Sequence, residues 1–521
     1  TDADGGTIMF PFRFCAVGML ILLSACSATS SKPPMENSTF VCNKDLHVEN
    51  PIAQLDSTAK TSDFLSLHEN KDAYQWRLAL VDQAEVSLDV QTFIWEDDEA
   101  GGLLIDRILK AANRGVKVRL LVDDFLLAGR DSLGVLVNSH PNIELRVFNP
   151  MEVRESRMAF RGMEMLFNLA RLNQRMHNKL FIADNKAGII GGRNIGNEYF
   201  GLGHKLNYRD FDLVARGPVV EEITYSFDVF WNSPYSLPLH EVANDRTLKD
   251  IHSVKAQNEA RQALDEQING SDALNQAFDT QVQDWREMFD QASEHVVSGR
   301  SRVIYDCPPS AEDPDPVHVA ELLRKIALSA EKEVFFISPY LIPSKTFRED
   351  LKALKAKGVR VRILTNSLES SDSAAAVSGY AKYRKDLLEL GVEIHELRAD
   401  ADFADRFKAA LSQADFLSFH AKVIIFDRSA VYVGSLNLDP RSRELNTEIG
   451  VLIENNALAE TLTNDFEVDL MIDNSWSVEL NEDNQVIWRS ADDDLTSTPA
   501  RNFWQRASMF FYSLLPIESQ L

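Results

Sequence analysis

One pattern of residues occurs twice in this chain and constrains its fold more than any other feature. A histidine is followed by a lysine two positions later and an aspartate five positions after that, at His177, Lys179 and Asp184 and again at His420, Lys422 and Asp427. Each copy leads into a Gly-Gly-x-Asn or Gly-Ser-x-Asn segment, and the copies lie 243 residues apart. Gly115 and Gly358, in a separate pattern, have the same separation. Two patterns that repeat in register indicate an internal duplication.

The segments before each motif predict the same order of strands and helices. Runs rich in β-branched and aromatic residues alternate with stretches of helical pattern, at 85–95, 102–113 and 114–122 in the first half and at 333–342, 346–357 and 357–364 in the second. Such alternation is typical of parallel βαβ units, in which helices cover the faces of a sheet. We therefore expect an α/β fold made of two similar domains.

The spacing within each motif has a physical reason. Residues two positions apart on a strand face the same side, so His177 and Lys179 present an imidazole and an ammonium group together, as do His420 and Lys422. The aspartates lie an odd number of residues from the histidines and open turn sequences, so we interpret them as residues that fix a turn rather than transfer protons. The glycine corners allow the close approach of an anion. The side chains predicted to bind its oxygens are Asn194, Asn437 and Ser435.

Two histidines, two lysines and two asparagines are groups that suit a phosphodiester. Lysine and asparagine donors neutralise the non-bridging oxygens, one imidazole attacks phosphorus, and the other protonates the leaving oxygen. Each imidazole needs an acidic partner that fixes its tautomer, and Asp212 and Glu448 are the predicted partners. The alternative for each is a solvated carboxylate at a strand end. The other histidines show no metal-ligand grouping, so no metal site is expected.

These motifs resemble those of the phospholipase D superfamily over roughly residues 65–480. Residues 176–179, 191–200, 439–448 and 515–521 are further similar to the bacterial cardiolipin synthase branch of C type. The resemblance implies two tandem α/β/α sandwich domains, related by a pseudo-twofold axis, that share one active site. A monomer is expected, because one chain carries both motifs. The resemblance also implies that the six motif residues form the catalytic set without a cofactor, with His177 as nucleophile and His420 as general acid and then base.

The resemblance implies the transfer of a phosphatidyl group, without a metal, through a phosphatidyl-histidine. In the C-type branch, phosphatidylglycerol and a second phospholipid, such as phosphatidylethanolamine, give cardiolipin. Two alternatives stay open: a hydrolase that releases phosphatidic acid, and a phosphodiesterase that cuts nucleic acid. The net charge of −25 counts against a nucleic-acid partner, and it gives little attraction to anionic lipid. Contact with a membrane surface therefore needs an apolar anchor.

The N-terminal segment supplies such an anchor. Its apolar run is too short to span a bilayer but suits a signal peptide, and it ends in Leu-Ser-Ala-Cys, which resembles a bacterial lipobox. We expect residues 1–25 to be a signal peptide, Cys26 to carry lipid and residues 26–60 to form a tether. This predicts a membrane-anchored lipoprotein of the bacterial envelope that faces the periplasm, where Cys42 and Cys307 are able to pair. An uncleaved anchor is the alternative, and the choice between inner and outer membrane stays open.

Composition divides the rest of the chain into four parts. We expect a first phospholipase D-like domain at 61–240, a helical linker at 241–300, a second such domain at 301–490 and a C-terminal tail at 491–521. A linker is favoured over a lid for the helical part. The tail is aromatic-rich and has no acidic residue between 502 and 516. This pattern fits an amphipathic helix that lies on a lipid surface or docks on the core, and docking is favoured.

Overall fold

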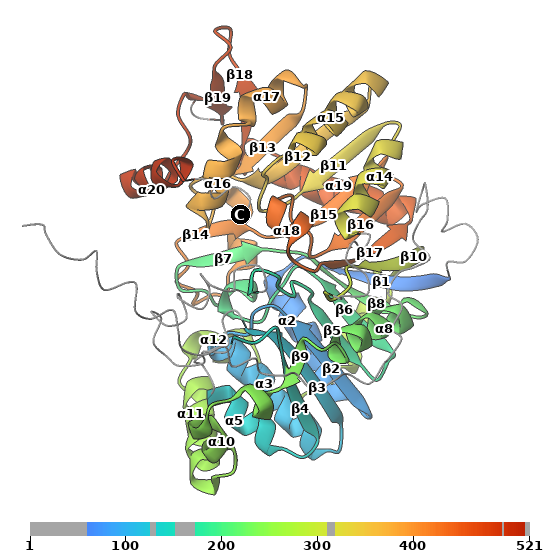
Figure 1. Cartoon of the computed structure of the whole chain (residues 1–521), viewed down its shortest axis with the longest axis vertical. Coiled ribbons are helices and arrows are strands. Elements are labelled where there is room, and N and C mark those ends of the chain that lie inside the picture. The colour runs from blue at the N-terminus through green and yellow to red at the C-terminus, as the bar shows by residue number, and fades with distance from the viewer. Residues whose placement is uncertain (1–59, 125–131, 152–171, 310–317, 492–493, 516–521) are drawn as a thin grey trace, which may run out of the picture. The chain divides into compact units, whose positions relative to one another are not determined.

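The computed structural model describes residues 60–124, 132–151, 172–309, 318–491 and 494–515. The chain divides into two units, Thr1–Phe40 and Val41–Leu521. The first unit, which includes the predicted signal peptide and Cys26, lies outside the described residues, and so does Cys42. Cys307, in the second unit, is disulfide-bonded. The second unit contains two halves of similar architecture, drawn one above the other in Figure 1.

Each half has three parallel strands followed by three antiparallel strands. In the first half β2, β3 and β4 are parallel, and β2 continues antiparallel through β5 and β6 to β8. The second half repeats this with β11, β12 and β13, and then β15, β16 and β17. The bounds are β2 (Ser87–Thr92), β3 (Lys117–Asp123), β4 (Ile143–Phe148), β5 (Leu180–Ala183), β6 (Ala187–Gly191), β8 (Asp212–Arg216), β11 (Glu333–Ile337), β12 (Arg360–Asn366), β13 (Glu393–Leu397), β15 (Val423–Phe426), β16 (Ala430–Gly434) and β17 (Ile449–Glu454).

Two strands join the halves into one sheet. β1 (Thr61–Leu67) pairs with β8 on one side and with β10 (Val297–Tyr305) on the other, and β10 pairs in turn with β17. Within the described residues the continuous sheet has 18 strands. Its outer strands are β9 (Ser236–Pro238) beside β4, and β18 (Ser475–Leu480), β19 (Val486–Arg489) and β20 (Asp494–Leu495) beyond β13. A separate two-stranded parallel sheet consists of β7 (Leu206–Arg209) and β14 (Phe416–Phe419).

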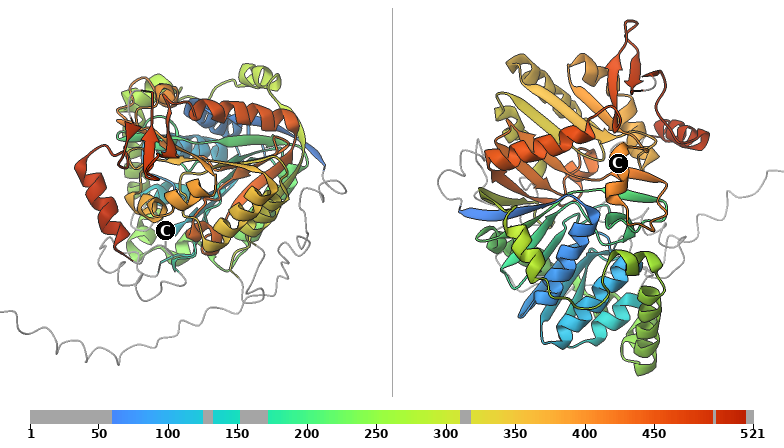
Figure 2. Two further views of the ribbon diagram at one scale, coloured as in Figure 1. Left: turned by 90° about the horizontal axis from the view of Figure 1, so that it is seen from above. Right: turned by 180° about the vertical axis from the view of Figure 1, so that it is seen from behind.

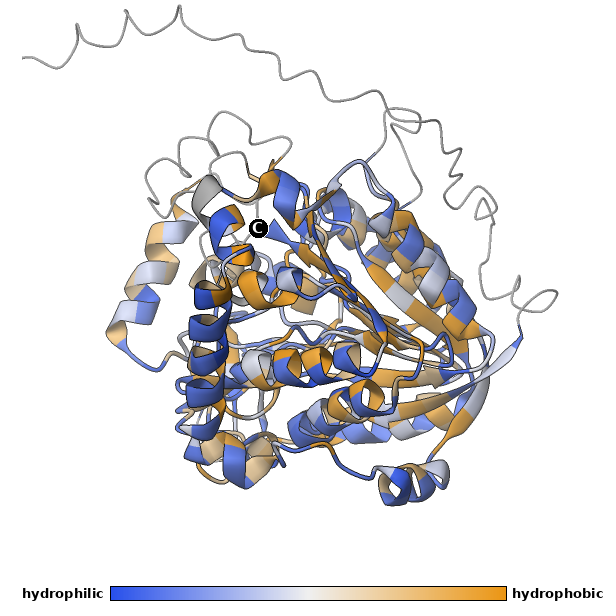
Figure 3. Ribbon diagram, turned by 90° about the horizontal axis from the view of Figure 1, so that it is seen from below, coloured by the Kyte–Doolittle hydropathy of each residue, from blue (hydrophilic) through white to orange (hydrophobic). Residues whose placement is uncertain are grey.

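Helices cover both faces of the sheet in each half (Figures 1 and 2). The first half carries α2 (Asn70–Gln83), α3 (Glu99–Asn113), α5 (Ser132–Ser139) and α8 (Val219–Trp231). The second half carries α14 (Val319–Ser329), α15 (Lys345–Lys357), α16 (Ala374–Ala381), α17 (Arg384–Glu389), α18 (Pro440–Glu444) and α19 (Asn456–Asp469). Two 3₁₀ helices are η2 (Asn197–Tyr199) and η3 (Asp402–Phe407). Figure 3 shows polar and apolar residues mixed along the helices, as expected when one face packs on a sheet.

Alternation along the strands divides the core between the two faces. On β11, Phe336 belongs to a cluster with Leu351 of α15, whereas its neighbour Phe335 belongs to a second cluster with Phe466 of α19. Successive side chains on a strand point to opposite faces, so both faces of β11 are apolar and buried. The second cluster also includes Leu213 of β8, so one apolar core runs through both halves. The predicted α/β fold with a duplicated domain is therefore observed.

Local signals explain where the helices begin and end. The Ser344 side chain accepts a hydrogen bond from the Phe347 amide at the start of α15, and Gly358 ends this helix with a φ of 77°. A left-handed residue after a helix favours glycine, because a Cβ is strained there. The predicted strand 85–95 is shorter in the structure, since β2 ends at Thr92 and the chain turns aside to a single bridge between Trp95 and Ile195.

The segment between the halves is helical, as its polar pattern predicted. It contains α9 (Leu239–Val242), α10 (Asp245–Ile251), α11 (Val254–Asn269), α12 (Asp272–Ala277) and α13 (Arg286–Ser293). Leu264 of α11 is buried, and Arg261 donates to Asp106 of α3 at 2.6 Å. These helices therefore pack on the outer side of the first half and lead into β10.

The C-terminal tail forms the helix α20 (Phe503–Ser513), which has no buried residue. Gln505 donates to the Leu368 carbonyl at 2.8 Å, just before α16, so the helix is attached at one side. Phe503 and Trp504 are 73% and 76% exposed. No helix in the described part of the chain is long and apolar enough to cross a membrane.

Candidate active site

The aspartate of each motif lies in a tight turn beyond the histidine and lysine. Asp184 and the residue after it have φ of 54° and 53°, and Asp427 and its successor have 51° and 53°. Positive φ at both central residues is what a type I′ turn requires, and the Lys186 and Ser429 amides donate back to the Ala183 and Phe426 carbonyls. The Asp184 carboxylate accepts three backbone N–H groups of residues 85–87, and the Asp427 carboxylate accepts three of residues 331–333. Both carboxylates therefore lie at the turn and tie it to the start of β2 or β11.

His177 of the first half contacts a carboxylate of the second half. Its Nδ1 lies 2.9 Å from Oε2 and 3.1 Å from Oε1 of Glu448. Glu448 is fully buried and stands one residue before β17. Burial raises the pKa of Glu448 to about 7, while the charge of Lys179 opposes the shift. The structure thus contains the predicted contact between Glu448 and an imidazole, and it shows that this contact crosses between the halves.

His420 of the second half contacts a carboxylate of the first, and here the sequence interpretation is wrong. His420 Nδ1 lies 2.5 Å from Oδ2 of Asp210, not of Asp212. Asp212 Oδ2 accepts from Arg77 at 2.9 Å and from Arg193 at 3.2 Å, and both arginines belong to the first half. Asp212 therefore holds its own half together, and Asp210 takes the place beside the imidazole.

Backbone hydrogen bonds between the halves position both pairs. The His177 amide donates to the Thr447 carbonyl at 2.9 Å, and the His420 amide donates to the Arg209 carbonyl at 2.9 Å. Thr447 and Arg209 each stand directly before the carboxylate residue that contacts the imidazole. Beside His177, Met176 and Thr447 form a β-bridge between the halves. Beside His420, β14 of the second half pairs with β7 of the first. Both pairs therefore lie at one junction and repeat the same geometry.

The motif lysines are buried beside the histidines. Lys179 Nζ donates to the His177 carbonyl at 2.6 Å, and Lys422 Nζ donates to the His420 carbonyl. Burial lowers the pKa of Lys179 to about 7 and that of Lys422 to about 8, and nearby carboxylates oppose both shifts. An anion in the site compensates for the desolvation of a buried ammonium group and favours its charged form.

Burial disfavours the charged form of both imidazoles. Burial lowers the pKa of His177 well below its usual value, and the charges of Lys179 and Lys422 lower it further. Burial lowers the pKa of His420 to about 4; Lys422 and Lys179 add to this shift, while the Asp210 carboxylate opposes it. The lysine of each half thus lowers the pKa of the histidine in the other half, so the two motifs form one electrostatic environment.

The predicted phosphate-binding side chains lie in different surroundings. Asn194 donates to the Tyr199 hydroxyl at 2.8 Å and accepts from the Ile94 amide at 3.2 Å. The side-chain oxygen of Asn437 is buried, and the described part of the chain offers it no hydrogen bond. The Ser435 hydroxyl donates to Glu448 Oε2 at 2.5 Å. The expectation that Ser435 binds phosphate directly is therefore corrected, because its proton is directed to the carboxylate behind His177.

Gly192 of the first motif stands where the second motif has Ser435, and the space around it accounts for the difference. A Cβ at Gly192 would lie 2.2 Å from Oδ1 of Asp210. The Asp210 carboxylate thus packs directly on the Gly192 backbone, while Glu448 is held by the Ser435 hydroxyl. The two halves support their carboxylates differently, although the histidine contacts are alike.

Sequence reasoning missed an aromatic lining around the histidines. The ring of His420 lies 4.8 Å from that of Tyr208 and 5.3 Å from that of Tyr199, and the ring of His177 lies 5.2 Å from that of Phe93. Tyr208 also donates to Asp372 at 2.9 Å. These residues come from separate loops and strands, so no spacing pattern connects them with the motifs.

Comparison with known proteins agrees with this architecture. The sequence profile described as "Cardiolipin synthase, PLD-like domain" matches residues 78–231 and 323–470. Cardiolipin synthase C of Escherichia coli is 34% identical over 87% of this chain and 94% of its own length. A cardiolipin synthase of Clostridium perfringens is 24% identical over 80% of this chain and 72% of its own. The crystal structure of phosphatidylserine synthase from Haemophilus influenzae superposes with a TM-score of 0.54 at 15% identity, covering 81% of this chain and 91% of that one, and so shares the fold. The chain belongs to the phospholipase D-like family of cardiolipin synthases and carries two copies of its domain.

Proposed function

We propose that this protein is a phosphatidyltransferase that makes cardiolipin from phosphatidylglycerol and a second phospholipid. The observation that carries the proposal is the crossed arrangement of the histidines, each held at Nδ1 by a carboxylate of the other half. Because Nδ1 of each imidazole is occupied by a carboxylate, Nε2 is the atom left for the substrate, and both Nε2 atoms are proposed to act on one phosphorus. The cardiolipin synthases of Escherichia coli and Clostridium perfringens support the choice of lipid over other phosphodiesters.

The proposed reaction has two displacements at phosphorus. In the first, His177 Nε2 forms a bond to the phosphorus of the donor phospholipid, the bond to the head-group oxygen breaks, and His420 gives that oxygen a proton. In the second, His420 takes the proton from the terminal hydroxyl of phosphatidylglycerol, whose oxygen displaces His177 and forms cardiolipin. Glu448 and Asp210 keep the Nδ1 protons in place during both steps.

The buried cations are proposed to bind the phosphate oxygens. Lys179 and Lys422 lie beside the histidines, and their buried ammonium groups are the donors proposed for the non-bridging oxygens. Fixed cations in a buried site stabilise the charge that develops on a five-coordinate phosphorus. The negative charge of the phosphodiester also raises the pKa of His420, so that the imidazolium form is available to protonate the leaving oxygen.

A product assay tests the function. Purified protein is incubated with labelled phosphatidylglycerol, with and without phosphatidylethanolamine, and the lipids are separated. We expect labelled cardiolipin as the main product, more of it when phosphatidylethanolamine is present, and no effect of a chelator. Phosphatidic acid as the main product would show a hydrolase instead. Cleavage of an oligonucleotide with no turnover of lipid would contradict both lipid functions.

Attachment to a lipid surface is proposed to bring the chain to its substrate. The helix α20 exposes Phe503, Trp504, Phe510 and Phe511, by 73%, 76%, 65% and 59%, and carries no acidic residue. Aromatic side chains of this kind enter the boundary between head groups and acyl chains. A lipid on Cys26 adds a second anchor, and the disulfide at Cys307 fits the periplasm. We therefore propose a monomeric lipoprotein of the bacterial envelope.

Sedimentation with vesicles of phosphatidylglycerol and phosphatidylethanolamine tests the role of α20. In a Cys26→Ser background, which removes the expected lipid, we expect Trp504→Ser with Phe511→Ser to weaken vesicle binding by about tenfold or more, because two aromatic side chains no longer leave water. Val254→Ser, which removes a side chain that is 70% exposed on α11, is the matched control and should bind as before. Equal binding by both variants would exclude α20 as a membrane contact.

A further inference from the structure

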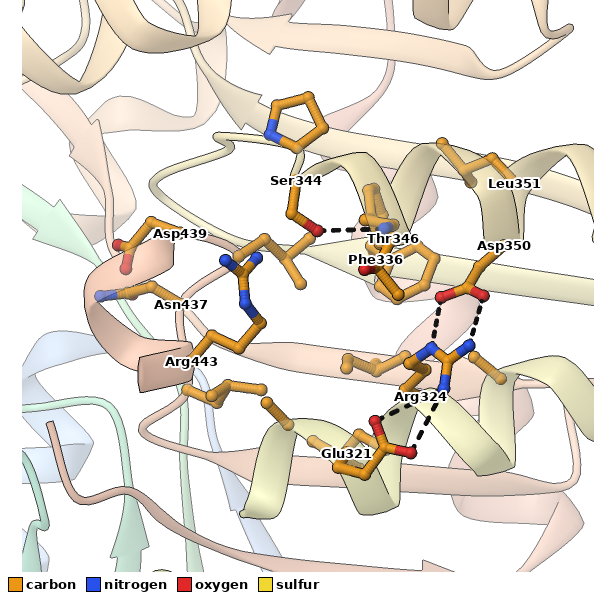
Figure 4. Close-up of a pocket in the computed structure, with 18 of the residues that line it drawn as sticks. Glu321, Arg324, Phe336, Ser344, Thr346, Asp350, Leu351, Asn437, Asp439 and Arg443 are labelled. Atoms are coloured by element: carbon orange, nitrogen blue, oxygen red, sulfur yellow. Dashed lines mark hydrogen bonds and ion pairs between the residues drawn. The ribbon is translucent and has the colours of Figure 1, made fainter. Parts of the chain in front are cut away.

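A cavity of about 320 Å³ opens beside the second motif, between α14 and α15 (Figure 4). Its volume is at the lower end of the range for small-molecule sites, about 300–1,000 Å³. Most of its wall is apolar and includes Leu323, Ala327, Phe336, Phe347, Leu354 and Leu436. Asn437 also lines the cavity, so the apolar space begins at a residue that follows the motif.

The two ends of the cavity differ in polarity. Figure 4 shows Asn437 and Asp439 together at one end and Arg324 with Asp350 at the other. Arg324 donates to Asp350 at 2.6 and 2.9 Å, so its charge is already compensated. The end at Asn437 has a buried side-chain oxygen that lacks a hydrogen bond within the described residues. A ligand that fits donates a hydrogen bond to the Asn437 oxygen and has an apolar chain that reaches toward Arg324.

The first half fills the same place with larger side chains. The helices α2 and α14 can be aligned on the residues that end them, Ala84 and Ala330. In this alignment Tyr74 of the first half corresponds to Ala320 of the second, and Val81 corresponds to Ala327. Tyr74 is fully buried, donates to the Ala100 carbonyl at 2.5 Å, and packs its ring 4.5 Å from Phe200 and 4.8 Å from Phe278. The second half has alanine at both positions, and both alanines line the cavity.

We propose that this cavity binds one acyl chain of the phospholipid whose phosphate lies at the second motif. The proposal rests on the proposed function, because it requires a phospholipid in the site. An acyl chain supplies apolar surface along the whole wall, and a hydroxyl of the glycerol head group supplies the donor that the Asn437 side-chain oxygen lacks. Because the first half is filled by Tyr74, the two substrate lipids are bound unequally, and only one of them is selected by acyl length.

A series of phosphatidylglycerols with increasing acyl length tests the cavity. Each methylene that enters contributes about fourfold to affinity, until the chain meets the Arg324 end. Binding is measured by titration with the phosphatidylglycerols in monomeric solution, and kcat/KM by the product assay. We expect the affinity and kcat/KM to rise with acyl length and then to reach a plateau. Affinity that does not depend on acyl length would overturn the proposal.

The variant Ala320→Tyr places in the second half the residue that fills the first. We expect its affinity to level at a shorter chain, with a loss of about tenfold or more for the longest monomeric lipid and little change for the shortest. Ala353→Tyr is the matched control, because Ala353 lies on the exposed side of α15. If Ala320→Tyr does not fold, Phe347→Ala gives the opposite test, since it lengthens the cavity and should shift the plateau to longer chains. Folded Ala320→Tyr with an unchanged length profile would contradict the assignment.

Binding and turnover separate this proposal from the proposed function. If binding depends on acyl length and Ala320→Tyr moves the plateau to shorter chains, while no cardiolipin forms, the acyl site is supported and the synthase reaction is rejected. If cardiolipin forms but neither variant changes the dependence of affinity on acyl length, the synthase reaction is supported and the acyl site is rejected.

Discussion

Replacing His177 or His420 by alanine is expected to abolish phosphatidyl transfer, with a loss of about 10⁴-fold or more in kcat for each variant. The two imidazoles have different tasks at one phosphorus, so neither replaces the other. Their surroundings are otherwise kept, because the backbone bonds to Thr447 and Arg209 do not involve the side chains. Initial rates of cardiolipin formation measure the loss, and His240→Ala, at an exposed position, is the control that should keep full activity.

An activated substrate separates the two roles. With a phosphatidyl ester of p-nitrophenol, the leaving group needs no proton, so His420→Ala should release p-nitrophenol in a single burst and retain a phosphatidyl group on His177. His177→Ala should give no burst. Label found on His420 in the His177→Ala protein would reverse the assigned roles. Substantial steady turnover by either variant would contradict a mechanism that uses both histidines.

Asp210→Asn is expected to lower kcat by about 10³-fold to 10⁴-fold, since an amide in this position no longer holds the tautomer of His420. The effect on pH dependence has a definite sign. The Asp210 carboxylate raises the pKa of His420 against the effect of burial. Without this charge the pKa of His420 falls further, so the protonated form that serves the leaving group is lost at lower pH. The alkaline limb of the kcat profile should therefore move to lower pH.

Comparison with a surface carboxylate makes the Asp210 prediction specific. The Asp405 carboxylate is exposed and lies 3.7 Å from Lys408 at the surface, so Asp405→Asn should leave both rate and profile unchanged. Circular dichroism and thermal unfolding establish that Asp210→Asn folds. A folded variant with a reduced rate but an unshifted alkaline limb would assign Asp210 a structural part rather than the positioning of His420.

The fold and the two motifs could be predicted from the sequence because both depend on local patterns. Strand and helix periodicity located β2, β3, α3 and their repeats, and an odd spacing assigned Asp184 and Asp427 to turns. The partner of His420 could not be predicted in this way. Asp210 and Asp212 are two residues apart, so alternation along a strand gives both the same side, and only contacts between distant segments distinguish them.

Ser435 illustrates a second limit. Its position beside a glycine corner suggested a phosphate ligand, but β16 pairs with β17 and brings Ser435 next to Glu448. The hydroxyl then donates to a buried carboxylate, which would otherwise lack compensation for its loss of water. The acyl cavity could not be predicted either, because it depends on the small size of Ala320 and Ala327 at places where the first half has larger residues.

The strands β1 and β10, which join the two halves into one sheet, bear on how lipids enter and leave the site. Each of these strands is hydrogen-bonded on both sides, so prising the halves apart would break a continuous backbone ladder in the middle of the molecule. Opening of the site by separation of the two halves would therefore cost the hydrogen bonds of this ladder. We therefore expect lipids to enter and leave the site while the two halves stay joined along these strands.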